Sequence, residues 1–145
     1  MRGAIEVTGP GVVVTVDNPE DQENVEDPDK ARVLDLDLRQ AVNGLWSAGA
    51  EAVSINGQRI TSLTAIRSAE GIIQINYRPM NAPYEISAIG DPESLPGRFG
   101  DGSGGQWLRA VASNDNLQFS VRRENELTLP AGNTPLTYAT PGGAS

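Results

Sequence analysis

The stretch LDLDLRQAVNGLWSAGAEAVSI, residues 34–55, decides how this chain folds. Its larger apolar residues follow one another at steps of four, four and three positions: Leu34, Leu38, Val42 and Leu45. This is the period at which one face of an α-helix is apolar. Asp35 or Asp37 can cap the start of the helix, and Gly49 stops it. Residues 50–55 then predict a strand, so the stretch is a helix that leads directly into a strand.

Upstream of the helix, two β-branched runs predict strands at residues 4–8 and 12–16. The Gly-Pro-Gly sequence of residues 9–11 lies between them and predicts a turn. Residues 17–32 hold seven acidic side chains, two prolines and almost no apolar side chain. Such a segment cannot bury enough surface to offset its ordering entropy, so we predict an acidic mobile loop over 17–32. It lacks the spacing of acids, glycine and final glutamate that a calcium-binding EF-hand loop needs.

Downstream of residue 55, the pattern changes to short strands separated by turns. Residues 65–75 predict a β-hairpin whose turn is Glu70-Gly71. Residues 78–83, with two prolines, predict a connector. Residues 84–89 alternate apolar with polar side chains and predict a strand.

The last third of the chain begins with a glycine-rich segment. Residues 97–105, GRFGDGSGG, predict a flexible loop; a nucleotide-binding loop is disfavoured because no Lys-Ser or Lys-Thr pair follows. A helix is predicted over residues 106–112 and a strand over 117–121. Two shorter features complete the chain, a further strand at 127–129 and a frayed tail at 140–145.

The predicted order is strand, helix, strand, hairpin, strand, helix, strand. Without the hairpin this is the split βαββαβ pattern of ferredoxin-like folds. We therefore predict one α+β domain over residues 1–145. It is a ferredoxin-like βαββαβ sandwich with an inserted β-hairpin and two helices on one face of a mainly antiparallel sheet.

Composition excludes several classes of function. The formal net charge is -8, whereas nucleic-acid binding needs a concentrated basic face. No apolar run approaches the roughly 18–20 residues that span a bilayer. The chain has no histidine and no cysteine. Ser-His and Cys-His nucleophile systems are therefore impossible, as is a zinc site built from these residues. We expect no enzyme activity, no metal site and no cofactor.

Four stretches resemble a bacterial family of unknown function, the domain-of-unknown-function 881 family, also called uncharacterised protein family 0749. The stretches are GPGVVVTVDN at residues 9–18, DLRQAVNGLWSAGAEAVSINGQRITSLTAIR at 37–67, PYEISAIGDPESL at 83–95 and FSVRRENELTLPA at 119–131. In one place the chain departs from the family pattern, because a glycine-rich segment follows the AIGDP strand where the family has a longer helical one.

The resemblance implies a cellular context. Members of the family typically have an N-terminal membrane helix, a coiled-coil-like segment and then this domain outside the cytoplasmic membrane. Their genes often lie near cell-division genes in Gram-positive and actinobacterial lineages. By resemblance, the chain is a soluble part of a membrane-anchored envelope protein on the extracytoplasmic side, and the membrane is reached only through an anchor outside this chain. The resemblance implies no catalytic residues.

The segment SINGQRITSLTAIR, residues 54–67, holds the candidate binding residues. Five polar side chains could converge on a carboxylate or phosphate group, which guanidinium groups bind through two hydrogen bonds: Asn56, Arg59, Ser62, Thr64 and Arg67. The alternative is a simple turn, because Asn-Gly tolerates positive φ and the arginines can project into solvent. The aromatic side chains are interpreted as core and edge residues, not as sugar platforms: Trp46, Trp107, Tyr77 and Tyr84.

Three functions follow as hypotheses. The first is a non-enzymatic interaction or scaffold module linked to cell division or wall assembly. It would have protein partners, and exposed sheet edges favour a homodimer as one arrangement. The second is a small anionic-ligand binding module that uses the region from Asn56 to Arg67. The third, an enzyme, has the least support, because it would need a cleft holding a carboxylate of raised pKa.

Overall fold

The computed structural model describes residues 5–20 and 32–132, which form both strands and helices. In chain order the elements are β1 (Val7–Asp17), α1 (Asp35–Ser47), β2 (Ala52–Ile55), β3 (Gln58–Ile60), β4 (Ile66–Ala69), β5 (Ile72–Ile75), β6 (Arg78–Met80), β7 (Tyr84–Ile89), α2 (Leu95–Asp101), α3 (Ser103–Asp115) and β8 (Gln118–Leu129). The predicted α+β class is confirmed. The acidic segment falls largely on residues 21–31 and the tail on residues 140–145; these two parts lie outside the described residues.

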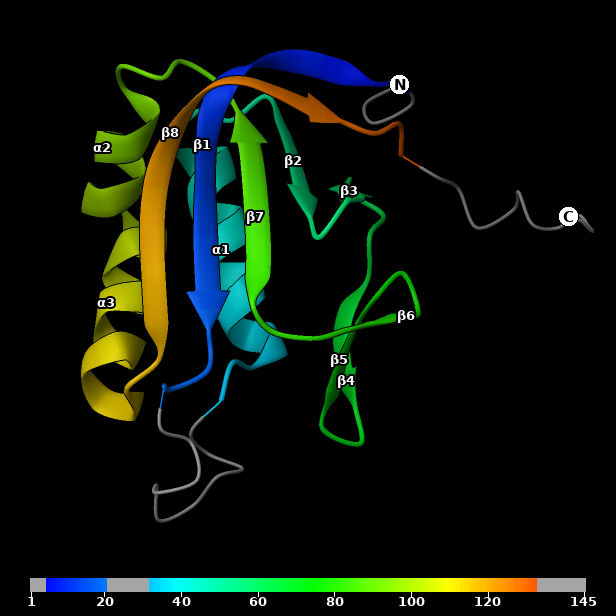
Figure 1. Ribbon diagram of the computed structural model, residues 1–145, viewed down its shortest axis with the longest axis vertical. Coiled ribbons are helices and arrows are strands. Elements are labelled where there is room, and N and C mark those ends of the chain that lie inside the picture. Colours follow the sequence, from blue (N-terminus) through cyan, green and yellow to red (C-terminus); the bar gives the residue numbers. More distant parts are fainter. Residues whose placement is uncertain (1–4, 21–31, 133–145) are drawn as a thin grey trace, which may run out of the picture.

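Two antiparallel sheets organise the strands (Figure 1). The larger has the order β3-β2-β7-β1-β8, so β7 lies between β1 and β2 and pairs with both. The smaller has the order β4-β5-β6. The predicted hairpin at residues 65–75 is confirmed as β4 and β5. The predicted connector at 78–83 is wrong in its first half, because residues 78–80 form β6 and add a third strand.

Helices cover one face of the larger sheet because the apolar faces of both layers meet there. The predicted stripe of α1 is buried at Leu38, Val42 and Leu45, while Leu34 precedes the helix and is 44% exposed. These side chains share a core with β1, β2 and β7 and with residues of α2 and α3. Three helices therefore occupy this layer within the described residues, where two were expected.

The predicted turn at residues 9–11 is wrong, because β1 continues through it as a single strand. The pairing of β1 with β8 shifts between Gly9 and Gly11, which marks a β-bulge. A Cβ atom at Gly11 would lie 1.8 Å from the carbonyl oxygen of Ala88, so only glycine allows β7 to approach this closely. The strands predicted at 117–121 and 127–129 are likewise joined in one strand, β8.

Beyond the bulge, the ends of β1 and β8 bend together toward the β2 side of the sheet (Figure 1). There Val7 and Leu127 pack on a second small cluster formed by Ala52, Ile89 and Leu129. These residues form a small apolar cluster on the face of the sheet that carries no helix.

The glycine-rich segment is helical, which corrects the flexible loop predicted at 97–105. Its residues form α2 and the first turn of α3. The reason is close packing: a Cβ at Gly104 would lie 2.9 Å from the Cα of Gly44 in α1 and 2.7 Å from the ring of Phe99. These glycines let helix backbones approach each other, and helix packing offsets their low helix propensity. None of the helices in the described part of the chain is long and apolar enough to cross a bilayer.

Candidate functional site

Asn56 has a structural role in the turn between β2 and β3. Asn56 and Gly57 have φ angles of 46° and 83°, as a two-residue hairpin with an Asn-Gly turn requires. The Asn56 side chain accepts a hydrogen bond of 2.8 Å from the backbone N–H of Glu85 and donates one of 3.5 Å to the carbonyl of Asn81. It therefore fastens the hairpin to the start of β7.

Arg59 is buried, with 7% of its surface exposed. Its Nη1 donates two hydrogen bonds of 2.9 Å, to the carbonyls of Ile5 and Pro130. Burial lowers the pKa of the guanidinium from its usual value. The side chain therefore joins β3 to the bent ends of β1 and β8, and its charge is directed at backbone carbonyls.

Ser62 and Thr64 lie in the loop between β3 and β4. Thr64 Oγ1 accepts a hydrogen bond of 2.7 Å from the backbone N–H of Thr61, and Thr61 Oγ1 accepts one of 3.1 Å from Leu63. The hydroxyl groups thus fold the loop back on itself. This fixed loop forms one wall of a cavity.

Arg67 lies in β4, and its guanidinium stands 5.5 Å from the ring centroid of Tyr77. Cation–π contacts at exposed sites contribute about 0.5–1 kcal/mol. Both residues are exposed in the smaller sheet. The contact therefore stabilises the turn between β5 and β6 and does not line the cavity.

A cavity of about 420 Å³ opens between one face of α1 and the segment from β3 to the start of β4. Its lining residues are Arg39, Val42, Asn43, Trp46, Glu51, Arg59, Ile60, Thr61, Ser62, Thr64 and Ile66. Three of the five predicted site residues are brought together here, namely Arg59, Ser62 and Thr64. Asn56 and Arg67 are not among the lining residues.

Sequence reasoning missed the α1 side of this cavity. Arg39, Asn43 and Trp46 line it, and they follow one another at steps of four and three. This spacing puts them on one face of the helix, beside the apolar stripe. The signal was present in the sequence, but a polar stripe on a helix is ordinarily its solvent face.

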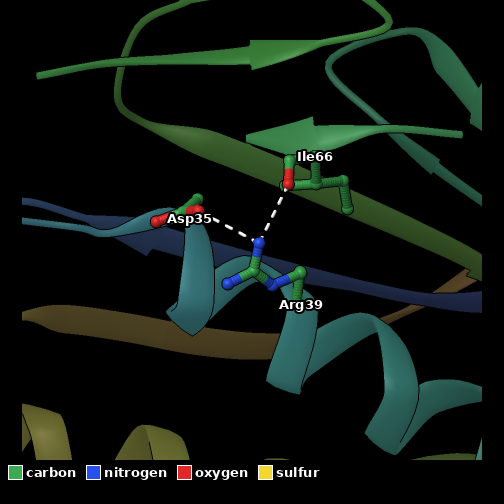
Figure 2. Close-up of polar contacts among 3 residues, drawn as sticks. All are labelled: Asp35, Arg39 and Ile66. Atoms are coloured by element: carbon green, nitrogen blue, oxygen red, sulfur yellow. Dashed lines mark hydrogen bonds and ion pairs between the residues drawn. The ribbon is translucent and has the colours of Figure 1, made fainter. Parts of the chain in front are cut away.

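Arg39 lines the cavity and connects α1 to the smaller sheet. Figure 2 shows its contacts with Asp35 and Ile66. Its Nη1 lies 3.0 Å from Asp35 Oδ2 and donates a 3.0 Å hydrogen bond to the carbonyl of Ile66 in β4. The Arg39 charge is therefore balanced by Asp35 within one helical turn, and the position of β4 is fixed relative to α1.

The cavity is chemically suited to holding a ligand. It offers one carboxylate, on Glu51, two guanidinium groups, an amide, three hydroxyls and one indole ring. Among the described residues, no three acidic side chains lie close enough to one another to hold a metal ion. Of the five residues in the anionic-ligand hypothesis, Asn56 and Arg67 do not line the cavity. Arg59 lines it, but its hydrogen bonds go to the carbonyls of Ile5 and Pro130.

Comparison with known proteins shows one family over nearly the whole chain. Residues 1–140 match the profile of a family described as bacterial protein of unknown function, DUF881. UPF0749 protein Rv1823 of Mycobacterium tuberculosis is 40% identical over 135 residues, which are 88% of this chain and 44% of that protein. UPF0749 protein YlxW of Bacillus subtilis is 30% identical over 127 residues, 88% of this chain and 54% of that protein. The chain thus spans about half the length of these curated relatives.

A solved structure has the same fold. It is the crystal structure of an uncharacterized conserved protein from Mycobacterium tuberculosis, which is similar with a TM-score of 0.74 at 26% sequence identity. The similarity covers 97% of this chain and 93% of that chain. The architecture that positions the cavity is therefore not peculiar to this sequence.

Proposed function

This chain belongs to the DUF881 family of bacterial proteins of unknown function, and from that premise we propose that it is a non-enzymatic interaction module. Its partner is a second copy of the same domain. The two copies pair along β8, the strand at one edge of the larger sheet. The observation that carries the proposal is the length and exposure of this edge.

Within the described residues, β8 pairs with β1 alone, although it is 12 residues long. Eight of these residues are exposed, so no helix or loop of residues 5–20 and 32–132 covers most of this strand. Unpaired backbone groups along such an edge bind another strand readily. Charged side chains on an edge strand disfavour pairing with most other strands. A strand whose charges are complementary can still pair.

The charged side chains of β8 are complementary to those of a second copy of β8 that runs antiparallel to it. Its centre reads Arg122-Arg123-Glu124-Asn125-Glu126. Two antiparallel copies related by a two-fold axis at Arg123 place Arg122 of each copy opposite Glu124 of the other. Both side chains lie on the face without helices, because their neighbour Arg123 pairs with the core residue Val12 and strand side chains alternate.

This register places one pair of like charges opposite each other, which is unfavourable. The two Arg123 side chains meet at the axis, but they are exposed and can turn into solvent. In the single chain, Arg122 Nε lies 2.8 Å from Glu124 Oε2 on the surface. An ion pair of this kind contributes about 0–1 kcal/mol to stability. In the dimer, two Arg122–Glu124 pairs between the copies replace the ion pair within each chain, and each contributes about 0.2–1 kcal/mol. The expected dimer is therefore weak.

Cysteine crosslinking tests this pairing, because the chain contains no cysteine of its own. We expect R123C to form a disulfide-linked dimer, since opposite Cβ atoms in antiparallel strands are about 4.5–5.5 Å apart. Q118C is the matched control in the same strand, and its two copies would lie about 33 Å apart. Equal crosslinking of both variants, or none at R123C, contradicts the proposal.

We also propose that the domain acts on the extracytoplasmic side of the membrane, in a longer anchored protein with a role in division or wall assembly. The family resemblance supports this, as does the additional length of the relatives. The test is labelling of the full-length protein with a membrane-impermeant maleimide, using S113C at an exposed position of α3. We expect labelling in intact cells; labelling only after lysis contradicts the location.

Finally, we propose that β2-β7-β1-β8 and the helices that cover them form a ferredoxin-like unit. The support is the order of these strands, in which β7 lies between β1 and β2, the two strands that α1 connects. In solution, nuclear Overhauser contacts from β7 to both neighbours are expected, at the pairs Val13–Ser87 and Ser54–Ser87. Direct contacts between β1 and β2 would contradict it.

A further inference from the structure

We propose that the cavity between α1 and the loop at residues 61–65 binds a neutral, hydroxyl-rich ligand the size of one or two sugar rings. The cavity adjoins β3, at the opposite edge of the sheet from β8. The inference is therefore independent of the proposed pairing through β8. Its volume of about 420 Å³ lies within the range of small-molecule sites.

The charges around the cavity balance, which disfavours an anion as its preferred ligand. Two guanidinium groups line it, on Arg39 and Arg59, and one carboxylate, on Glu51. Asp35 pairs with Arg39 at 3.0 Å and supplies the second negative charge. The Nη1 atoms of both arginines also donate to backbone carbonyls. An anion would therefore have to compete with partners inside the protein for Nη1 of either arginine.

The polar groups that remain suit hydroxyl groups. Guanidinium, carboxylate and carboxamide groups are planar and can each bind two adjacent hydroxyls of a sugar ring. Glu51 and Asn43 bring a carboxylate and a carboxamide to the cavity, and Arg39 adds its guanidinium nitrogens other than Nη1. All three residues are exposed. Ser62 is exposed as well and adds a hydroxyl that both donates and accepts.

The apolar part of the lining completes the match. Trp46 is partly buried and packs against the core, and it lines the cavity. The C–H face of a sugar ring stacks on an indole, whose π face is negative. Val42, Ile60 and Ile66 form the rest of the apolar lining. Trp46 therefore serves as an aromatic platform, which revises its interpretation as only an edge residue.

The test is a titration followed by ¹⁵N–¹H NMR with defined probes. The neutral probes are glucose, maltose and N-acetylglucosamine, and the anionic probes are glucose 6-phosphate and inorganic phosphate. We expect at least one neutral sugar to shift the side-chain signals of Asn43 and Trp46 at about millimolar concentrations, a typical weak affinity. Inorganic phosphate should leave these signals unchanged.

Variants distinguish this site from non-specific binding. Trp46→Ala should weaken the affinity for the responding sugar at least about tenfold, a loss of about 1.4 kcal/mol. Asn43→Ala tests the site without touching the core, because Asn43 is exposed, and should weaken affinity severalfold. Asn114→Ala, exposed on α3 and outside the cavity lining, should not change it. Shifts caused only by the anions, or no shift with any probe up to about 50 mM, overturn the proposal.

Discussion

The indole N–H of Trp107 donates a hydrogen bond of 2.8 Å to the carboxylate of Asp37, 70 residues earlier in the chain. The other carboxylate oxygen accepts a bond of 2.8 Å from the backbone N–H of Leu34 at the start of α1. Asp37 is only 3% exposed. A single buried carboxylate therefore caps one helix and fastens another to it.

Replacing Asp37 with alanine should destabilise the domain by roughly 2–4 kcal/mol. The estimate combines the loss of a helix cap with a part-buried indole N–H left without a partner. Urea unfolding at neutral pH measures the change. Asp35→Ala is the control, because it removes an acid of the same turn whose ion pair with Arg39 is exposed. That pair contributes about 0–1 kcal/mol, so equal effects of the two changes would refute the role given to Asp37.

Gly104→Ala should destabilise the domain by about 1–3 kcal/mol, the usual range for overpacking. The added Cβ would lie 2.9 Å from the Cα of Gly44 and 2.7 Å from Cε1 of Phe99, so α1 and α3 must move apart. Gly97→Ala is the matched control within α2, since a Cβ there meets nothing within 4 Å. It should stabilise by about 0.4–1 kcal/mol. Melting temperatures that rise in both variants would show that the helices are not closely packed.

These glycines show where sequence reasoning reached its limit for the fold. The class, α1 and β7 follow from local periodicity, which the sequence displays directly. The glycine-rich segment was mistaken for a loop because glycine has low intrinsic helix propensity. The contact that offsets this propensity joins Gly104 to Gly44, 60 positions apart, and no local pattern reports it. The same holds for Gly11, whose neighbour Ala88 lies in a distant strand.

Arg59→Met should cost roughly 2–4 kcal/mol, because it removes the donor to two carbonyls, those of Ile5 and Pro130. Arg67→Met should cost about 1 kcal/mol or less, since its contact with Tyr77 is exposed. Chemical denaturation of both variants compares the two arginines directly. A small effect at Arg59 would favour a binding role over the structural one.

Burial raises the pKa of Tyr84 above its usual value; Arg32 opposes the shift and Asp17 adds to it. A raised pKa in the folded state means that the folded protein holds this proton more tightly than the unfolded chain. The associated stability is complete below about pH 10, the pKa of an unfolded tyrosine, and is lost as pH rises through the folded value. The free energy of unfolding of Tyr84→Phe should therefore fall less steeply with pH than that of the native protein above about pH 10. An unchanged alkaline slope would contradict this assignment.

The candidate site was only partly predictable for a similar reason. The segment from Asn56 to Arg67 was identified by its side chains, and three of those residues do meet at the cavity. The sequence could not show that the Arg59 guanidinium donates hydrogen bonds to the carbonyls of Ile5 and Pro130. Nor could it place α1 opposite the loop at residues 61–65, because the arrangement depends on how the helix packs on the sheet.

The central claim, pairing of two copies along β8, is tested most directly by charge exchange at Arg122 and Glu124. Sedimentation equilibrium would measure the dimer fraction of R122E, of E124R and of their equimolar mixture. Each variant alone places like charges opposite each other and should dimerise less than the native domain. In the mixture, a copy with two acidic side chains at positions 122 and 124 faces a copy with two basic ones. Both cross-strand pairs are then of opposite charge, so the dimer fraction should return to at least the native level. A mixture as monomeric as the separate variants, or variants that dimerise as well as the native domain, would contradict the account.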